Sequence, residues 1–378
     1  MRISNTSLKL SFLVLLIFLF SSLYASETRV ATMGGGGIFV KDQSLVFLFP
    51  GTIHQYPDLV VAEMRARGND AFYSLGIHMD YGNMVSGLYI NQPINSLALA
   101  PLGGGYFAQA AELNNALAYM LGLKLGGFDA GFGFIGASST YEDNTTDPVT
   151  EENAYYAGIV AGISNEDMDI GLKFELPSIE VQPADNKYSG FVLMANGRYR
   201  LMQRNGYDIF PVASFGFGTT EIKDAAEFGL LSFALGVGVE KQINEDNLLV
   251  VGLEVSRLSI TTTPDGGDET VDAVSTLPGI YVGVESRISS WLIGRIGATH
   301  VNQLISEEVG GDDESITLSE FRLSLGLGME FSNFLLDFNF NETSLFDGIY
   351  IFDGVGGTTF ASTVSITYNF GGGEDEEN

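Results

Sequence analysis

The chain has no cysteine, and histidine is nearly as scarce. The absence of cysteine excludes a disulfide scaffold, a cysteine-ligated zinc site and a thiol nucleophile. The three histidines, His54, His78 and His300, accompany no G-x-S-x-G sequence in the strand-to-helix context that a serine hydrolase needs. We therefore expect no enzyme, no catalytic or metal-ligating residue and no cofactor, and a structural or interfacial role for each histidine.

Basic residues are the second shortage, because 18 Lys and Arg stand against 47 Asp and Glu. Nucleic acid is excluded as a partner, since its phosphates have to be neutralised by clustered Lys and Arg. Such acidity is typical of disordered chains, but 45% apolar residues, 27 Phe and 16 Tyr provide ample apolar surface to bury. The 47 Gly, combined with many aromatics, favour closely packed strands over helices.

Long hydrophobic runs are the third shortage. The run Phe12–Phe20 has nine residues, whereas a membrane-spanning helix needs about 20. Arg2 and Lys9 precede this run and small residues up to Ala25 follow it, an order typical of a secretory signal peptide. We predict a cleaved signal at residues 1–25, with an N-terminal anchor as the less favoured alternative. No later segment is long enough for a spanning helix, so a membrane protein with this sequence has to be a closed barrel.

Apolar residues recur at every second position in many strand-sized segments. In Phe321–Phe331 the odd positions are apolar and the even positions are polar or glycine, and the same period appears in 170–176, 231–240, 249–256 and 334–341. A transmembrane barrel needs this pattern, with apolar side chains toward lipid and polar ones toward the lumen. We predict an all-β fold, a closed antiparallel transmembrane β-barrel over residues 57–370, with about 16 strands and both ends in the periplasm, or 14 strands if two early segments lie outside the wall.

The connections between these segments alternate in length. Short turns near 126–127, 164–167, 204–206, 244–246, 289–290 and 332–333 alternate with longer polar segments at 140–152, 178–187, 261–274, 302–314 and 341–357. Outer-membrane barrels combine short periplasmic turns with long extracellular loops, whereas a soluble β-sandwich does not need every second loop to be long and acidic. Aromatic residues cluster beside the short turns, as in a membrane-interface girdle: Phe128, Tyr207, Phe210, Trp291, Phe331 and Phe334.

The last predicted strand ends in T-V-S-I-T-Y-N-F, with Val364, Ile366, Tyr368 and Phe370 on one face. This resembles the C-terminal signal of outer-membrane proteins that the barrel-assembly machinery recognises, although here the acidic tail 371–378 follows it. The resemblance implies a porin-like barrel of the bacterial outer membrane, in contact with lipid and lipopolysaccharide. Residues 33–61 resemble the N-terminal region of porin-like barrels and, faintly, of fatty-acid-transporter-type barrels. We expect residues 26–56 to form a periplasmic or lumenal segment outside the wall.

Acidic residues gather in three of the longer connections. None of these groups has the spacing of a calcium-binding loop, so we interpret them as solvated surfaces and leave weak collective binding of divalent cations as an alternative. The groups are Glu142, Asp143, Asp147, Glu151 and Glu152; Asp265, Asp268, Glu269 and Asp272; and Glu307, Glu308, Asp312, Asp313 and Glu314.

Charged residues on the predicted inner face are the candidates for lining a pore, because charged rings in a lumen set ion selectivity. By strand parity they are Lys173, Glu175, Arg198, Arg200, Glu240, Glu254, Glu285, Arg287, Arg322, Glu330 and Asp337. Their alternative role is a salt-bridged plug. The leading hypothesis is a channel for passive diffusion of small hydrophilic solutes with a weak cation preference. The alternatives are a transporter of hydrophobic compounds with an N-terminal hatch, and a non-transporting structural or assembly barrel.

Overall fold

The computed structural model describes residues 28–67, 70–94, 96–104, 113, 115–144, 150–183, 185–204, 206–310, 312–340 and 361–371. The predicted signal peptide, the tail beyond residue 371 and the connection 341–360 lie outside the described residues. Within the described part, no helix is both long and apolar enough to cross a membrane.

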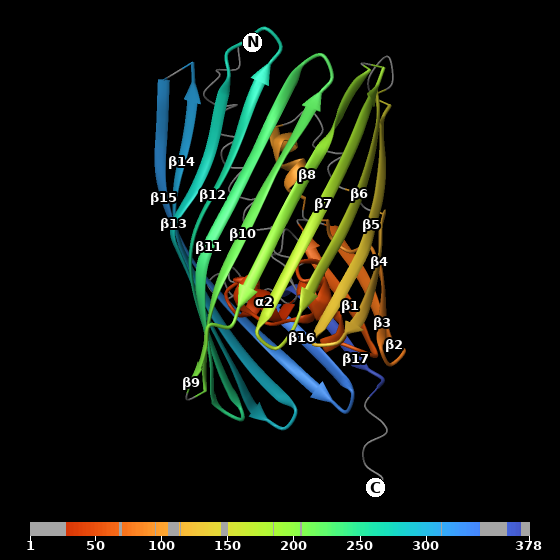
Figure 1. Ribbon diagram of the computed structural model, residues 1–378, viewed down its shortest axis with the longest axis vertical. Helices are drawn as coiled ribbons and strands as arrows, with labels where there is room; N and C mark the ends of the chain where they lie inside the picture. The colour runs from red at the N-terminus through yellow and green to blue at the C-terminus, as the bar shows by residue number, and fades with distance from the viewer. Residues whose placement is uncertain are drawn as a thin grey trace, which may run out of the picture.

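The strands form one antiparallel sheet that closes on itself (Figure 1). Apart from the short β9, each strand pairs with the next along the chain, and the first strand, β1, pairs with the last, β17, from Leu59 opposite Asn369 to Arg65 opposite Thr363. Closure gives the backbone N–H and C=O groups of the edge strands hydrogen-bond partners, which a lipid environment requires. The short β9 continues β8 along the same partner, β10. Counting β8 and β9 as one strand, the barrel wall has sixteen strands. The predicted fold class is confirmed.

The strands lie close to the ranges expected from the period of two. They are β1 (Leu59–Arg67), β2 (Asp70–Asp80), β3 (Met84–Ile90), β4 (Asn115–Leu125), β5 (Phe128–Asp143), β6 (Thr150–Ser164), β7 (Met168–Gln182), β8 (Asn186–Tyr199), β9 (Met202–Arg204), β10 (Tyr207–Ile222), β11 (Ala226–Asn244), β12 (Asn247–Pro264), β13 (Thr270–Ser289), β14 (Leu292–Val309), β15 (Asp312–Phe331), β16 (Phe334–Phe340) and β17 (Ala361–Asn369).

Several longer connections contain more strand than their polarity suggests. The segment 302–314 is almost entirely strand, because β14 and β15 stay paired out to Val309 opposite Asp312. Residues 178–182 likewise belong to β7. Cross-strand hydrogen bonds in a long hairpin do not depend on apolar side chains, so polar residues continue a ladder that the wall has already aligned.

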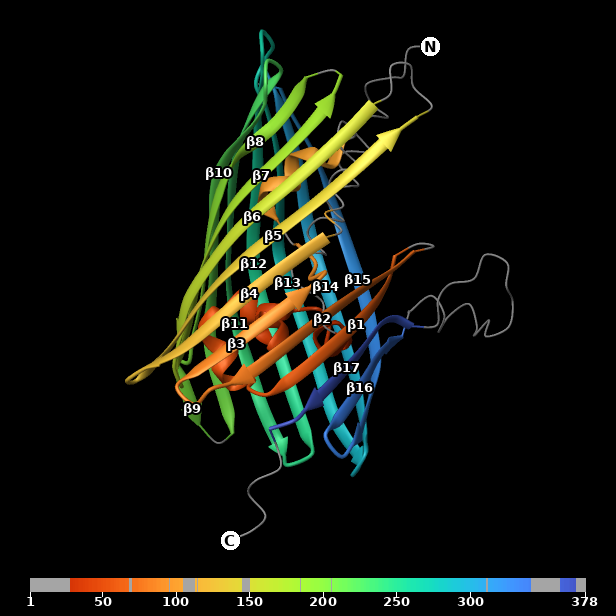
Figure 2. The same cartoon turned by 90° about the vertical axis from the view of Figure 1, so that its right-hand side faces the viewer.

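The wall is uneven in height (Figure 2). The strands β1–β4, β16 and β17 have 7 to 11 residues, whereas β5–β8 and β10–β15 have 14 to 20. The outer surface is apolar along the strands. Phe321 is 64% exposed, Leu235 is 56% exposed and Phe132 is 55% exposed, as expected for side chains that face lipid.

The expected aromatic residues beside the short turns are on that outer surface, with one exception. Trp291 stacks on Phe331 with ring centroids 6.0 Å apart, and Phe334 stacks on Tyr368 at 4.4 Å. Phe210 is buried inside the barrel instead, 3% exposed, because its place in β10 has inward parity. An interfacial role for Phe210 is therefore wrong.

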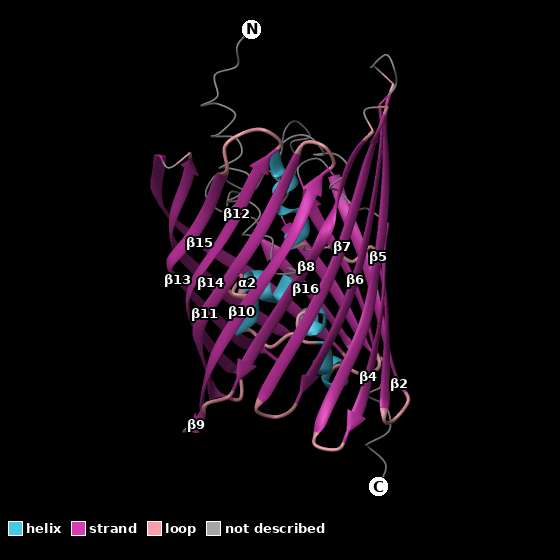
Figure 3. Ribbon diagram, turned by 45° about the horizontal axis from the view of Figure 1, so that its top comes forward, coloured by secondary structure: helices cyan, strands magenta, loops and turns pink. Residues whose placement is uncertain are grey.

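Residues 28–56 lie inside the barrel, and we call them the lumenal segment (Figure 3). They form α2 (Thr28–Thr32), η1 (Gly37–Phe39), η2 (Gln43–Phe47) and η3 (Pro50–Gln55). A further helix, η4 (Leu97–Gly104), enters the lumen from the connection between β3 and β4 and lies nearer the opposite end (Figure 1). Both insertions pack against the inner wall.

Candidate functional site

The lumenal segment crosses the barrel from one wall to the other. Its η3 contacts β3–β7 and its α2 contacts β14–β17. Glycines of the inner wall make room for it. A Cβ atom at Gly171 would overlap the carbonyl of Leu48, and a Cβ at Gly131 would overlap that of Pro50. On the opposite wall, Gly297 leaves the same space for the backbone of Gly34. The wall is therefore shaped to the segment by close backbone approach.

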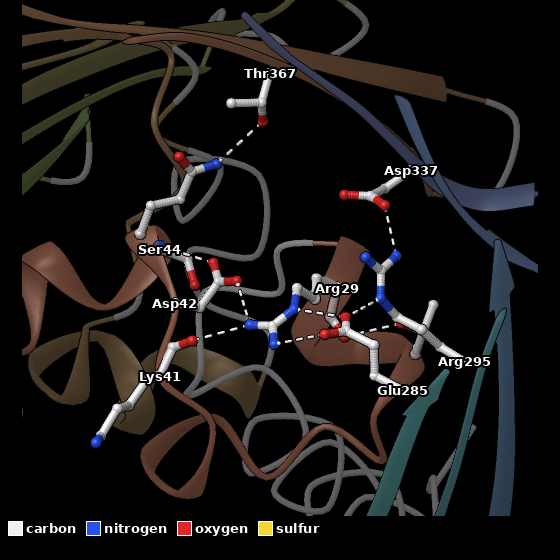
Figure 4. A network of polar contacts seen from close by, with 10 residues as sticks. Arg29, Lys41, Asp42, Ser44, Glu285, Arg295, Asp337 and Thr367 are labelled. Atoms are coloured by element: carbon white, nitrogen blue, oxygen red, sulfur yellow. Dashed lines mark hydrogen bonds and ion pairs between the residues drawn. The ribbon is translucent and has the colours of Figure 1, made fainter. Parts of the chain in front are cut away.

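Arg29 of α2 is the centre of the main polar network (Figure 4). Its guanidinium donates from Nε to Glu285 Oε2 at 2.8 Å and from Nη2 to Glu285 Oε1 at 3.1 Å. Its Nη1 donates to the carbonyl of Lys41 at 2.9 Å and to Asp42 Oδ2 at 3.2 Å. Burial by itself lowers the pKa of Arg29, but the bonds to Glu285 and Asp42 outweigh burial and raise that pKa above its ordinary value. Arg29 therefore stays charged.

The network continues into the wall. Arg295 of β14 donates from Nε to Glu285 Oε2 at 2.6 Å and from Nη1 to Asp337 of β16. The Arg295 side chain is 1% exposed. Two guanidinium groups thus face the carboxylates of Glu285, Asp337 and Asp42, and this mutual pairing offsets the cost of placing charges in the interior.

A second anchor lies on the opposite wall. Arg198 of β8 donates to Asp169 Oδ2 from Nη2 at 2.6 Å and from Nε at 2.9 Å. Its third bond runs from Nη1 to the carbonyl of Ile38 in η1 at 3.4 Å. The same guanidinium lies 5.1 Å from the ring centroid of Phe49, a distance typical of a cation–π contact. Arg198 therefore contacts the lumenal segment in two places.

Histidine and amide contacts complete the attachment near the closing strands. The ring of His78 in β2 is 1% exposed, and its Nδ1 lies 2.6 Å from the carbonyl of Tyr56. Its Nε2 contacts the hydroxyl of Tyr89. Gln43 donates to Thr367 of β17 at 3.3 Å. These contacts fit the structural role expected for His78.

The remaining predicted pore-lining residues fall into separate groups. Glu175 is fully buried, accepts hydrogen bonds from Tyr156 at 2.8 Å and from Ser96, and pairs with Lys173 at 2.6 Å. The backbone N–H of Ala98 in η4 also donates to Glu175, at 3.3 Å. This group therefore holds η4 in place and does not border open water.

Three other arginines form ion pairs that are more accessible. Arg287 pairs with Glu330 at 2.6 Å, and both side chains are almost 40% exposed. Arg322 pairs with Glu320, at similar exposure. Arg200 lies 3.5 Å from Asp208 and 3.8 Å from Asp167. The last two candidates stand outside these pairs: Glu254 is 6% exposed on β12, and Glu240 is half-buried on β11.

The predicted set of pore-lining residues omitted the partners that organise these groups. Arg295 and Asp169 alternate with apolar neighbours in their strands, so the period of two was a usable signal for both. Arg29 and Asp42 belong to a segment without such periodicity, and no local signal predicted that they would meet the wall.

The assembly-signal candidates lie on one face of β17. Thr363 and Ser365 are buried toward the lumen, at 9% and 4% exposure, whereas Ile366 and Phe370 are 45% and 41% exposed. Recognition of Val364, Ile366, Tyr368 and Phe370 by an assembly machinery stays a prediction. Among the described residues, no group of three or more acidic or histidine side chains is arranged to hold a metal ion.

A cluster of buried apolar side chains lies on the inner face of the wall around η4. Buried side chains from β6–β8 and β11–β14 pack with Leu97, Ala98 and Ala100 of η4. They are Ala154, Ile179, Val181, Tyr188, Val192, Phe228, Leu230, Leu258, Ile260, Val274 and Ile305. This cluster lies at the end of the lumen that holds η4, which we call the upper half. The lower half holds the ion pairs together with two further apolar clusters around the lumenal segment.

No known family model and no curated protein matches this sequence. Solved structures with a similar fold include the FrpB iron transporter from Neisseria meningitidis, at 7% identity and a TM-score of 0.43, covering 75% of this chain and 61% of that chain. The alcaligin outer membrane receptor FauA from Bordetella pertussis is similar at 7% identity and a TM-score of 0.45, with 75% and 60% covered. This chain therefore spans about three fifths of the length of these two proteins. The toluene transporter TodX from Pseudomonas putida is similar at 10% identity and a TM-score of 0.40, with 92% and 98% covered.

Closure, an even number of strands and an apolar outer surface are together the properties of barrels that span a bacterial outer membrane. The protein is an outer-membrane β-barrel.

Proposed function

We propose that this barrel transports hydrophobic compounds across the outer membrane, with the lumenal segment 28–56 as a hatch. The observation that carries the proposal is the apolar inner surface of the upper half, which is built around Ile260, Leu230 and Val192 and is covered by η4. A water-filled pore has a polar lining, whereas a hydrophobic solute gains about 25 cal/mol for each Å² of apolar surface removed from water. The hatch below this surface blocks free passage of ions.

The test combines binding and conductance on the folded protein. We expect an anthroyloxy-labelled stearate to bind, with fluorescence enhancement, and planar bilayers containing the protein to carry little current. Ile260→Ala and Leu258→Ala should weaken probe binding, since both side chains are buried in the upper half. Leu253→Ala is the control, because this side chain is 46% exposed on the lipid side of the same strand. Equal loss in all three variants would contradict a lumenal binding site.

A second candidate is a channel for small hydrophilic solutes. It is supported by the partly exposed pairs Arg287–Glu330 and Arg322–Glu320, which leave charged groups accessible inside β13–β15. In this case the protein conducts ions, and a double variant with Arg322→Glu and Arg200→Glu shifts selectivity toward cations. An unchanged reversal potential would argue against these residues lining a conducting path. The absence of both ion current and probe binding would favour the non-transporting barrel.

A further inference from the structure

The outer face of the tall part of the wall changes from apolar to polar part-way up the strands. On β12, Leu253 and Val255 face outward and are 46% and 39% exposed, whereas the next outward positions are Arg257 and Ser259. On β15 the outward positions are apolar up to Phe321 and polar above it. Because lipid contact requires an apolar surface, this change marks the level at which the wall leaves the hydrocarbon of the membrane.

Above this level the wall presents hydroxyl groups. Turns of two residues join β13 to β14 and β15 to β16 at the lower end of the barrel, and short turns of outer-membrane barrels face the periplasm. The level therefore corresponds to the headgroups of the outer leaflet. The outward hydroxyl-bearing side chains above it on β12 and β15 are Ser259, Thr261, Thr263, Ser315, Thr317 and Ser319. Hydroxyl groups both donate and accept hydrogen bonds, so this surface suits the hydroxyls of a sugar.

Arg257 lies at the boundary itself and has no countercharge. Its side chain is exposed and lies on the outer face, since its cross-strand neighbour Phe233 is 41% exposed there. Its Nη1 donates to Ser275 Oγ at 3.2 Å, and within the part of the chain that the structure describes it has no ion-pair partner. Because its register neighbours are Phe233 and Ser275, no carboxylate lies directly beside it. Most of the guanidinium donors therefore stay available to a ligand.

A bulge in β13 lies next to this arginine. The register of β13 with both of its neighbours shifts between Thr276 and Gly279. Leu277 lies in this bulge on the outer face and is 56% exposed. It is two residues from Ser275, the register partner of Arg257, so Leu277 and Arg257 are diagonal neighbours on the same face. A bulge that re-aims a side chain in this way places an apolar group on the hydrocarbon side of the guanidinium.

We propose that this surface binds a phosphorylated glycolipid of the outer leaflet. The phosphate accepts hydrogen bonds from the Arg257 guanidinium, whose paired N–H donors match an oxyanion. An acyl chain lies on Leu277 and Phe233 below the arginine, and the sugars contact the hydroxyl groups of β12 and β15 above it. An arginine beside hydrocarbon is unfavourable, and the bound phosphate supplies the countercharge. The site is on the outer wall and does not depend on what the barrel transports.

The experiment uses the full chain folded in detergent micelles and counts bound lipid by native mass spectrometry. The probes are bisphosphorylated lipid A, the same lipid A after enzymatic dephosphorylation, and phosphatidylglycerol. We expect lipid A to bind about tenfold more tightly than its dephosphorylated form, since a hydrogen bond to a charged group is worth roughly that factor. Lipid A should also bind more tightly than phosphatidylglycerol, which lacks the sugars. Equal binding of lipid A and its dephosphorylated form overturns the phosphate contact, and equal binding of phosphatidylglycerol overturns the choice of a glycolipid.

Variants assign the site. Arg257→Gln should reduce the affinity for lipid A to that of the dephosphorylated form, whose own binding stays unchanged. Leu277→Ser should weaken both forms, because it removes a contact with the acyl chain. Lys241→Gln is the matched control, because Lys241 is a cation on the neighbouring strand β11 and lies 3.4 Å from the ring centroid of Tyr207 at the lower end of the barrel. A gel shift on boiling confirms that each variant is folded. Unchanged lipid A affinity in Arg257→Gln, or an equal loss in Lys241→Gln, overturns the assignment.

Discussion

At the scale of single residues, charge inside this barrel serves mainly to hold an insertion. Arg29 meets Glu285 and Asp42, and Arg198 meets Asp169. Removing one member of a buried pair leaves the other charge without compensation, which is far more costly than losing an exposed pair. The same residue type therefore has different importance in the lumen according to its burial.

The first prediction concerns Arg29→Met. It should weaken attachment of the lumenal segment by about 3–5 kcal/mol. Because the chain lacks cysteine, a single cysteine at Ser44, which is 5% exposed, reports release through its rate of maleimide labelling. That rate should rise by about a hundredfold or more.

Arg322→Met is the control in the same background, since its pair with Glu320 is about 40% exposed. Its effect should stay below about 1 kcal/mol. Similar labelling rates in the two variants would show that Arg29 does not hold the segment.

The second prediction concerns pH and His54 in η3. Burial lowers the pKa of His54 below the ordinary value of 6.5, against an opposing effect of Asp129. The released or unfolded state therefore takes up a proton at higher pH than the seated state. The stabilisation is present above pH 6.5 and is lost as pH falls through the lowered pKa. Thermal unfolding midpoints between pH 7.5 and 5.5 should fall more in the native protein than in His54→Gln; equal slopes would contradict this.

At the scale of elements, strand and insertion fit each other through glycine. Gly171 of β7 faces Leu48 so closely that no side chain can stand between them, whereas a Cβ at Gly197, on the neighbouring strand β8, meets nothing within 4 Å. The two glycines are one register position apart, since Gly197 pairs with Ile170. Gly171 faces the lumen and Gly197 faces the outer surface, which explains the difference.

The third prediction compares these two positions. Gly171→Ala should destabilise the seated segment by about 1–3 kcal/mol, the usual effect of overpacking, and should accelerate labelling of the cysteine at position 44. Gly197→Ala should leave the labelling rate unchanged. If alanine at 171 has no effect, the close approach of Leu48 is not maintained in solution.

At the scale of the whole molecule, closure between β1 and β17 makes the barrel one cooperative unit. We predict that the membrane-extracted protein migrates faster on a gel before boiling than after it, because a closed barrel resists detergent until it is heated. Deleting residues 28–56 should preserve this shift and increase ion current in planar bilayers, since the wall keeps its full ladder of hydrogen bonds. A full-length protein that does not shift on boiling would contradict a closed barrel.

The sequence by itself determined the wall. A strict period of two specifies strands and their faces, and the lack of long apolar runs leaves closure as the solution compatible with lipid; Phe321 and Leu235 therefore point outward as expected. The expectation of polar side chains toward the lumen did not hold in the upper half. There, Leu230 and Ile260 occupy inward positions and pack in the apolar cluster around η4.

Only the tertiary structure decided what fills the lumen. Arg29 and Glu285 are 256 residues apart, and no local pattern relates them. Arg198 and Ile38 come together for the same reason, because the wall curves around a segment that lacks periodicity. Periodicity records which face of a strand is buried, but contacts between an irregular insertion and a closed wall depend on shape and charge in three dimensions.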